Sequence, residues 1–391
     1  MKLFTTLTLA AGTLFCTPLF AQVTGPQSTD PLPTDPPTEE VEKTEEEPSF
    51  SLTGYVDAYY SSSLINSAGA NEDALLLPTS FSSATNTFGI GNVNLLAEKT
   101  MGDVSFVGQL GFGPRAVEAN GDSNFGGALT GNFASTVQQL YVAYSPSDAV
   151  TITLGNFGTF IGYEVIDVPG NANYTMSYLF SNGPFYHTGV KADFAIAEGF
   201  GAMVGVFNDT DSKLDVVGGK HYGAQLSFES GGFAGYLSAL AGKESEGSTD
   251  EDDDDTNEFQ IDLTATYEVS ESFMLGVNAS NYSSSVDGDA DGNGFFGTAL
   301  YATYTAKENL AFSLRGEYFG ATAAEGDDTD QPSVIALTAN SAITIGDLTI
   351  VPEFRYDTGS NGFGFSNVGN QPIDADDTSA LYFVVGAFYS F

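Results

Sequence analysis

Charged side chains that share one face of a strand are the groups of this sequence best suited to act on a solute. Apolar residues alternate with other residues around Lys191, Arg315 and Arg355, which places these cations on the face opposite the apolar one. Glu317 and Glu353 each stand two residues from an arginine and share its face. Such groups can neutralise one another as ion pairs. If their face borders a narrow body of water, they can instead create an electric field across that water.

Catalytic chemistry has little support in the sequence. His187 and His221 are the only histidines, and His187 shares the face of Lys191. A serine hydrolase would need a serine and a histidine within hydrogen-bonding reach of each other. We therefore expect no enzyme activity, no catalytic residue and no cofactor.

One acidic run has part of a metal-binding pattern. Residues 287–292 read DGDADG, which matches the first half of a calcium-binding loop. The twelfth position from Asp287 is Thr298, where a bidentate glutamate would be required, and the run joins two expected strands rather than two helices. We expect no specific metal site. A solvated loop and loose bridging of divalent ions to lipopolysaccharide remain as alternative interpretations.

The chain is strongly acidic, with 51 Asp and Glu against 11 Lys and Arg and a formal net charge of −40. Six of the acids run without interruption over 250–255, in what we expect to be a solvated loop. This balance excludes nucleic acid as a partner, because its phosphates need a basic surface. An acidic rim would concentrate cations at close range instead.

The start of the chain indicates export. Lys2, an apolar stretch over 3–15 and a plausible cleavage site before Gln22 predict a secretory signal peptide over 1–21. Residues 22–48 contain eight acids, one lysine and no aromatic residue, so we expect a disordered acidic periplasmic segment. That segment could be a spacer, or a tether that contacts the cell wall or plugs a pore.

The end of the chain indicates the class of fold. Strict alternation places Phe391 and Tyr389 on one face and Phe388 on the other. A last strand that ends on an aromatic residue is typical of the closing strand of a bacterial outer-membrane β-barrel. We therefore expect the barrel assembly machinery to recognise Phe391 and Tyr389 as its signal.

Between these ends, apolar residues come in short alternating runs, and none reaches the length of about 18 residues that a spanning helix requires. We predict an all-β, transmembrane antiparallel β-barrel of about 16 strands over 49–391, with short periplasmic turns and long extracellular loops. Tight turns are expected near 99–103, 145–149, 197–199, 229–232, 270–272, 306–309 and 345–347. Long loops are expected near 62–87, 114–133, 157–184, 208–219, 243–257, 283–294, 320–332 and 358–378.

The segment 154–190 resembles the OmpL-like putative β-barrel porins, the second porin family grouped under that name. The similarity rests on its residues 155–159, 162–164, 171–174 and 184–189, and on the opening strand 54–60. Asn156 and Met176 stand where a basic residue is common in that family. The resemblance implies an outer-membrane porin, but no particular solute and no inherited charge preference.

A barrel of sixteen strands leaves an aqueous lumen that something must narrow. We expect the third long loop, 157–184, to fold inward as the constriction and to set Glu164 and Asp167 across the pore from Lys191, Arg315 and Arg355. The predicted function is passive diffusion of small hydrophilic solutes and ions across the Gram-negative outer membrane.

The alternative function is a non-conducting structural or adhesion barrel with acidic surface loops. In either case we expect outer-membrane lipids, lipopolysaccharide and the assembly machinery as partners. By analogy with general porins, a homotrimer is also expected.

Overall fold

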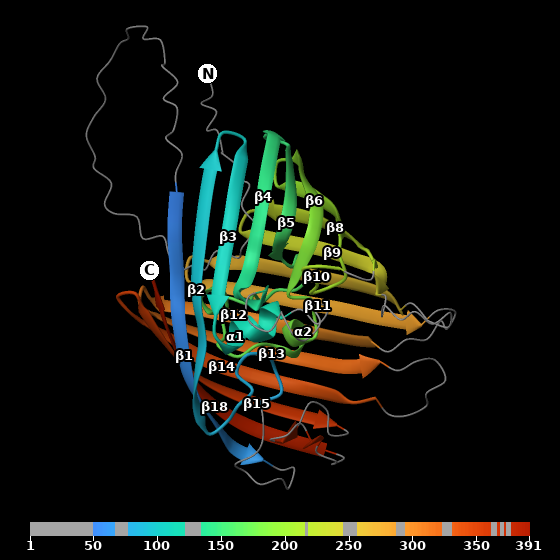
Figure 1. Ribbon diagram of the computed structural model, residues 1–391. Coiled ribbons are helices and arrows are strands. Elements are labelled where there is room, and N and C mark those ends of the chain that lie inside the picture. Colours follow the sequence, from blue (N-terminus) through green and yellow to red (C-terminus); the bar gives the residue numbers. More distant parts are fainter. Residues whose placement is uncertain are drawn as a thin grey trace, which may run out of the picture.

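Sixteen antiparallel strands form one closed barrel in the computed structural model of the chain (Figure 1). The strands follow chain order around the wall, and the last of them pairs with both the first strand and the fifteenth. The predicted fold class and strand number are therefore confirmed.

The structure describes residues 50–66, 77–121, 134–215, 218–244, 256–286, 294–322, 331–360, 366–367, 371–372 and 377–391. The predicted signal peptide, the segment 22–48, the acidic run 250–255 and the calcium-like run 287–292 lie outside these residues.

Each barrel strand is one of the short alternating runs of the sequence. The sixteen strands are β1 (Phe50–Asn66), β2 (Thr87–Met101), β3 (Val104–Phe112), β4 (Val137–Ser147), β5 (Val150–Gly158), β6 (Tyr186–Ala197), β7 (Phe200–Phe207), β8 (His221–Ser230), β9 (Phe233–Glu244), β10 (Thr256–Ser270), β11 (Phe273–Val286), β12 (Gly294–Lys307), β13 (Leu310–Thr322), β14 (Ser333–Ile345), β15 (Leu348–Ser360) and β18 (Asp377–Ser390). A separate two-stranded sheet is formed by β16 (Ser366–Asn367) and β17 (Gln371–Pro372).

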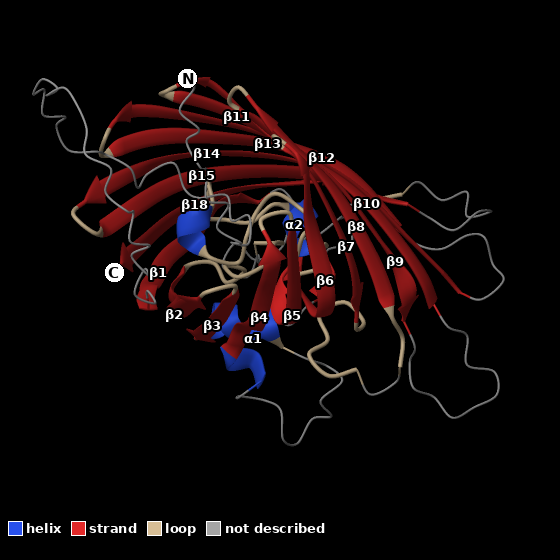
Figure 2. Cartoon of the chain, turned by 90° about the horizontal axis from the view of Figure 1, so that it is seen from above, coloured by secondary structure: helices blue, strands red, loops and turns tan. Residues whose placement is uncertain are grey.

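The joints between strands alternate in length as predicted. Seven tight turns, from 102–103 to 346–347, lie at one end of the barrel, and eight longer joints lie at the other. These ends are called the turn end and the loop end below. The longer joints hold the helices α1 (Pro114–Asn120) and α2 (Tyr178–Ser181) and the 3₁₀ turns η2 (Ala134–Thr136) and η3 (Val168–Gly170). Viewed from above, α2 and the loops next to it lie within the ring of strands (Figure 2).

The two faces of a strand differ in chemistry, as β10 shows. Phe259, Ile261 and Leu263 point outward and are 40–45% exposed, whereas Gln260 and Asp262 point inward and are buried. A barrel with an apolar band of this kind around its whole outer surface would aggregate in water. It fits the hydrocarbon of a membrane, which is the environment that outer-membrane barrels occupy.

The last residue closes the barrel. The backbone N–H and C=O of Phe391 bond with Gly54 of β1 at 3.0 and 2.9 Å. The ring of Phe391 lies directly over Gly54, where an added Cβ would come within 2.9 Å of the ring. Tyr389 and Phe391 are exposed on the outer face, whereas Phe388 packs against the interior.

We expect deletion of Phe391, or its replacement by aspartate, to impair assembly more than Phe388→Asp does. The terminal residue carries both the last backbone bonds of the β18–β1 seam and the outward aromatic ring. Heat-modifiable mobility on a gel and yield in the outer membrane measure the effect. Unchanged yield of the Phe391 deletion in cells would contradict the predicted assembly signal.

Candidate functional site

The joint between β5 and β6, residues 159–185, enters the barrel and crosses its interior; we call it the lumen loop. Its Gly162 amide donates to Asp262 of β10 at 3.0 Å. Farther along the loop, the carbonyl of Ala172 accepts a hydrogen bond from Asn340 of β14 at 2.8 Å. The loop therefore touches parts of the wall that lie four strands apart.

Two wall carboxylates hold the backbone of the lumen loop. Glu317 accepts the amides of Tyr178 and Leu179 at 2.9 and 2.8 Å. Glu353 accepts the amides of Tyr174 and Thr175 at 2.8 and 3.0 Å. Buried backbone donors need acceptors, and bonds to an ionised acceptor are the stronger ones.

Two arginines bind carbonyls of the same loop stretch. Arg315 donates to the Thr175 carbonyl at 2.7 Å and to Oε1 of Glu164 at 2.6 Å. Arg355 donates to the Met176 carbonyl at 2.6 Å and pairs with Asp357 at 2.9 Å. Donors and acceptors of the wall thus alternate along one short piece of loop backbone and fix its path.

The sequence has three arginines, and Arg115 is the one that was not predicted as a site residue. It also anchors the lumen loop. Arg115, on α1, lies 3.7 Å from Asp57 of β1, donates to the Ile166 carbonyl and stacks over the ring of Phe81 at 4.6 Å. Arg115, Arg315 and Arg355 are all at most 2% exposed. A buried guanidinium is costly unless it is paired and hydrogen-bonded, so these arginines must be held by their surroundings.

The acid Asp167 of the lumen loop lies against strands β1 to β4. It accepts from Tyr55 at 3.1 Å, from Gln109 at 2.7 Å and from Gln138 at 3.0 Å. Burial raises the pKa of Asp167, and these three hydrogen bonds act against that rise. Glu164, by contrast, lies beside Tyr301 of β12, on the far side of the ring from β4.

The predicted separation of charge across a pore is not the arrangement in the structure. Glu164 contacts Arg315 directly, because the loop is long enough to reach the wall and burial favours a close ion pair. Asp167 meets neutral donors instead of cations. Lys191 pairs with Asp193 at 2.9 Å on β6, with 16% of its side chain exposed, and the structure does not bring it to the other two cations.

The lumen is filled around its whole circumference at the level of the loop. Every barrel strand has an inward side chain that is buried to less than 9% exposure. In ring order from β1 to β18 these include Asp57, Asn94, Gln109, Gln139, Phe157, His187, Phe207, His221, Ser238, Asp262, Asn278, Ala299, Glu317, Thr338, Glu353 and Tyr382. Protein side chains therefore occupy the inner face of the wall on every side.

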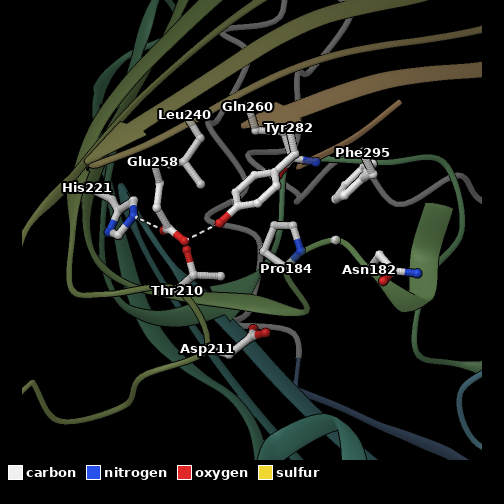
Figure 3. A pocket seen from close by; sticks show the side chains of 11 residues that line it. Asn182, Pro184, Thr210, Asp211, His221, Leu240, Glu258, Gln260, Tyr282 and Phe295 are labelled. Atoms are coloured by element: carbon white, nitrogen blue, oxygen red, sulfur yellow. Dashed lines mark hydrogen bonds and ion pairs between the residues drawn. The ribbon is translucent and has the colours of Figure 1, made fainter. Parts of the chain in front are cut away.

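A pocket of about 290 Å³ remains near the loop end, on the side of the lumen formed by β8 to β12 (Figure 3). Nε2 of His221 forms a hydrogen bond of 2.8 Å with the Glu258 carboxylate. The Tyr282 hydroxyl donates to the other oxygen of the same carboxylate. Asn182, Gly183 and Pro184 of the lumen loop form the opposite wall.

Asp211, in the joint between β7 and β8, fixes the end of the lumen loop. Its Oδ1 accepts the amides of Phe185 and Tyr186 at 2.8 and 2.9 Å. Burial raises the pKa of Asp211 to about 7, against the effect of these two hydrogen bonds and of the Lys213 ammonium. At neutral pH the Asp211 side chain is therefore protonated in part of the molecules and ionised in the others.

We expect the folded arrangement around Asp211 to lose stability as the pH rises, because burying the ionised carboxylate is costly. Its folded-state pKa of about 7 exceeds the ordinary value of 3.8, so the folded state holds the extra proton between these values and stability falls as pH increases through that window. Amide exchange at Phe185 and Tyr186, corrected for intrinsic rates, should be about tenfold less protected at one pH unit above the pKa than at one unit below it.

Asp211→Asn is the control for this experiment, because it keeps the acceptor oxygen and cannot titrate. Its protection should not change over the same range. Equal protection of the wild-type amides on both sides of neutral pH would contradict the assignment.

Neither a metal-binding cluster nor a membrane-spanning helix is present in the part of the chain that the structure describes. No three His, Cys, Asp or Glu side chains come together there in a way that could hold a metal ion. No helix among those residues is long and apolar enough to cross a membrane.

A closed sixteen-stranded barrel with an apolar outer band and a loop folded into its lumen defines a protein of the outer-membrane porin class. The chain belongs to the family described as Putative beta-barrel porin-2, OmpL-like, whose model matches residues 49–391. The resemblance carried by residues 154–190 is thereby confirmed. Family and fold indicate a channel rather than an enzyme.

Solved porin structures share the fold at low sequence identity. The trimer form of OmpT, an outer membrane protein of Vibrio cholerae, is 13% identical with a TM-score of 0.58, over 88% of this chain and 100% of that one. The anion-selective porin from Comamonas acidovorans is 13% identical with a TM-score of 0.56, over 88% and 100%. The outer membrane channel DcaP of Acinetobacter baumannii is 15% identical with a TM-score of 0.53, over 90% and 99%. No curated protein matched the sequence.

Proposed function

We propose that this protein is a porin through which small hydrophilic solutes and ions cross the outer membrane by passive diffusion. The lumen loop is the constriction and sets the size limit. The observation that carries this proposal is the anchoring of the loop from several parts of the wall at once. Glu317, Glu353, Arg315 and Arg355 hold it on β13 and β15, Asp262 holds it on β10, and donors of β1, β3 and β4 hold its Asp167. A loop held in this way is a permanent part of the passage.

The predicted site residues take two roles in this proposal. Five of them set the width of the passage because they hold the loop in place: Glu164, Arg315, Glu317, Glu353 and Arg355. Asp167 does the same on the wall of β1 to β4. The pair Lys191 and Asp193, which keeps part of its surface in water, faces solutes on the turn-end side of the loop.

The proposal includes an orientation and partners. The tight turns face the periplasm and the longer joints face the outside, as in other outer-membrane barrels. A signal peptide over 1–21 exports the chain, and the assembly machinery inserts it. The lipids and lipopolysaccharide of the outer membrane surround it, and a homotrimer is the proposed assembly, since the similar OmpT has a trimer form.

Current recordings of the purified protein in a planar bilayer test this proposal. We expect discrete but small conductance steps, because the lumen is narrow at the level of the loop. The reversal potential in a tenfold potassium chloride gradient then gives the charge preference. A silent wild-type protein, inserted and folded, would contradict the proposed function.

The filled lumen also favours a second candidate, a non-conducting structural barrel. The same recordings separate the two functions, because only a porin conducts with its native loop in place. A barrel that is silent as wild type, but conducts after the loop is shortened, would establish the second candidate.

A further inference from the structure

The pocket near the loop end has the dimensions of a small-molecule site. Its volume of about 290 Å³ corresponds to about ten water molecules. Asn182 is exposed and Thr210, Asp211, Glu258 and Tyr282 are half-buried, so solvent reaches it. The labelled side chains come from the lumen loop, from the β7–β8 joint and from the wall strands (Figure 3).

The polar groups of this pocket are mainly acceptors. Glu258 accepts from His221 and Tyr282, one donor for each carboxylate oxygen, and an ionised carboxylate has about four acceptor positions. Asp211 uses Oδ1 for two loop amides, and Oδ2 has no hydrogen bond within the described ranges. Both carboxylates can therefore accept further hydrogen bonds from a ligand.

The charge around the pocket is negative in either state of the imidazole. Nδ1 of His221 lies 3.7 Å from Oδ1 of Asp209, and its Nε2 lies 2.8 Å from Glu258. Asp209 and Glu258 thus flank this imidazole, and Asp211 adds a further carboxyl group to the lining of the pocket. An anionic ligand would meet these acids directly, and a cation would be attracted by them.

The remaining wall of the pocket is apolar. It consists of Leu240, Pro184 and the stacked rings of Tyr282 and Phe295. The centroids of these two rings are 5.4 Å apart. An aromatic face attracts a cation, and a short carbon stem gains from contact with such a wall.

We propose that this pocket binds small organic cations that carry a primary ammonium group on a short carbon stem. An ammonium group has three donors and no acceptor, which matches the free acceptor positions of Glu258 and Asp211. The stem lies against Leu240 and the two rings. This inference goes beyond the proposed function and does not depend on it, because a pocket can bind a ligand whether or not the barrel conducts.

Three four-carbon compounds with matched stems test the proposal by titration calorimetry on the full-length barrel in a nonionic detergent, at a pH above the pKa of Asp211 so that both carboxylates are ionised. We expect butanediamine to bind at least about tenfold more tightly than neutral butanediol, and butanedioate to bind least. Glu258→Gln and Asp211→Asn should each weaken diamine binding about tenfold, because each removes one charge-assisted acceptor. Glu268→Gln, at the turn end of the same strand as Glu258, should leave it unchanged.

Heat-modifiable mobility shows that each variant is folded before it is titrated. Asp211→Asn keeps the acceptor for the loop amides, so it remains informative if Glu258→Gln fails to fold. Equal affinity for diamine and diol overturns the proposal, and so does preference for butanedioate. Undiminished diamine binding in both variants also overturns it, since the amine would then bind elsewhere. Loss of conductance alone bears on the proposed function and not on this site.

Discussion

Replacing residues 163–183 of the lumen loop by a short Gly-Ser linker is expected to raise single-channel conductance at least about fivefold. The barrel wall has the strand number of general porins, whose lumen is an aqueous channel unless it is filled. In this protein the loop crosses the interior, and every strand has a buried inward side chain. Planar-bilayer recordings of both proteins measure the change.

The matched control shortens the joint 245–255. Strands β9 and β10 pair up to Glu244 and Thr256, so a short linker can close that hairpin. This control should keep the conductance of the wild type. If both deletions have the same conductance as the wild type, the lumen loop does not limit the passage.

Arg355→Met is expected to lower the free energy of unfolding by about 3–5 kcal/mol, the cost of leaving one partner of a buried ion pair behind. Asp357 would keep its charge without a cation, and the Met176 carbonyl would lose the shorter of its two hydrogen bonds, keeping the one from Arg315 at 3.2 Å. Both side chains of the pair are fully buried, so water cannot replace the guanidinium. The midpoint of urea unfolding in lipid vesicles reports the change.

Lys191→Met is the control for this experiment. Lys191 and Asp193 keep 16% and 41% of their side chains exposed, and a pair of this kind contributes less than about 1 kcal/mol. A similar small change in both variants would show that Arg355 does not hold the loop.

The wall could be predicted from the sequence because its signal is local. A strand repeats every two residues, so Glu317 and Arg315 are assigned to the inner face by their immediate neighbours alone. The tight turns follow from the same pattern, since each one interrupts it. Phe391 and Phe388 are separated by the same rule, and the structure places them on opposite faces.

The contacts of the lumen loop could not be predicted in this way. Glu164 and Arg315 are 151 positions apart, and no period of the sequence relates them. A glycine offers a partial signal. Gly386 interrupts the inner face of β18, and the ring of Tyr174 occupies the space where its Cβ would stand. Arg115 gave no signal, because it lies in a joint that has no alternation.

The long sequence separation of the loop anchors has a consequence for the order of folding. Glu317 and Glu353 come 138 to 179 positions after the loop amides that they bind. The loop therefore cannot settle until the last third of the wall has formed, and contacts of such long range form slowly. During biogenesis a nearly complete sheet must exist with its polar interior still wet and the loop unattached. Loop docking and the β1–β18 seam would then be late steps that support each other, and a mutation at either would delay both.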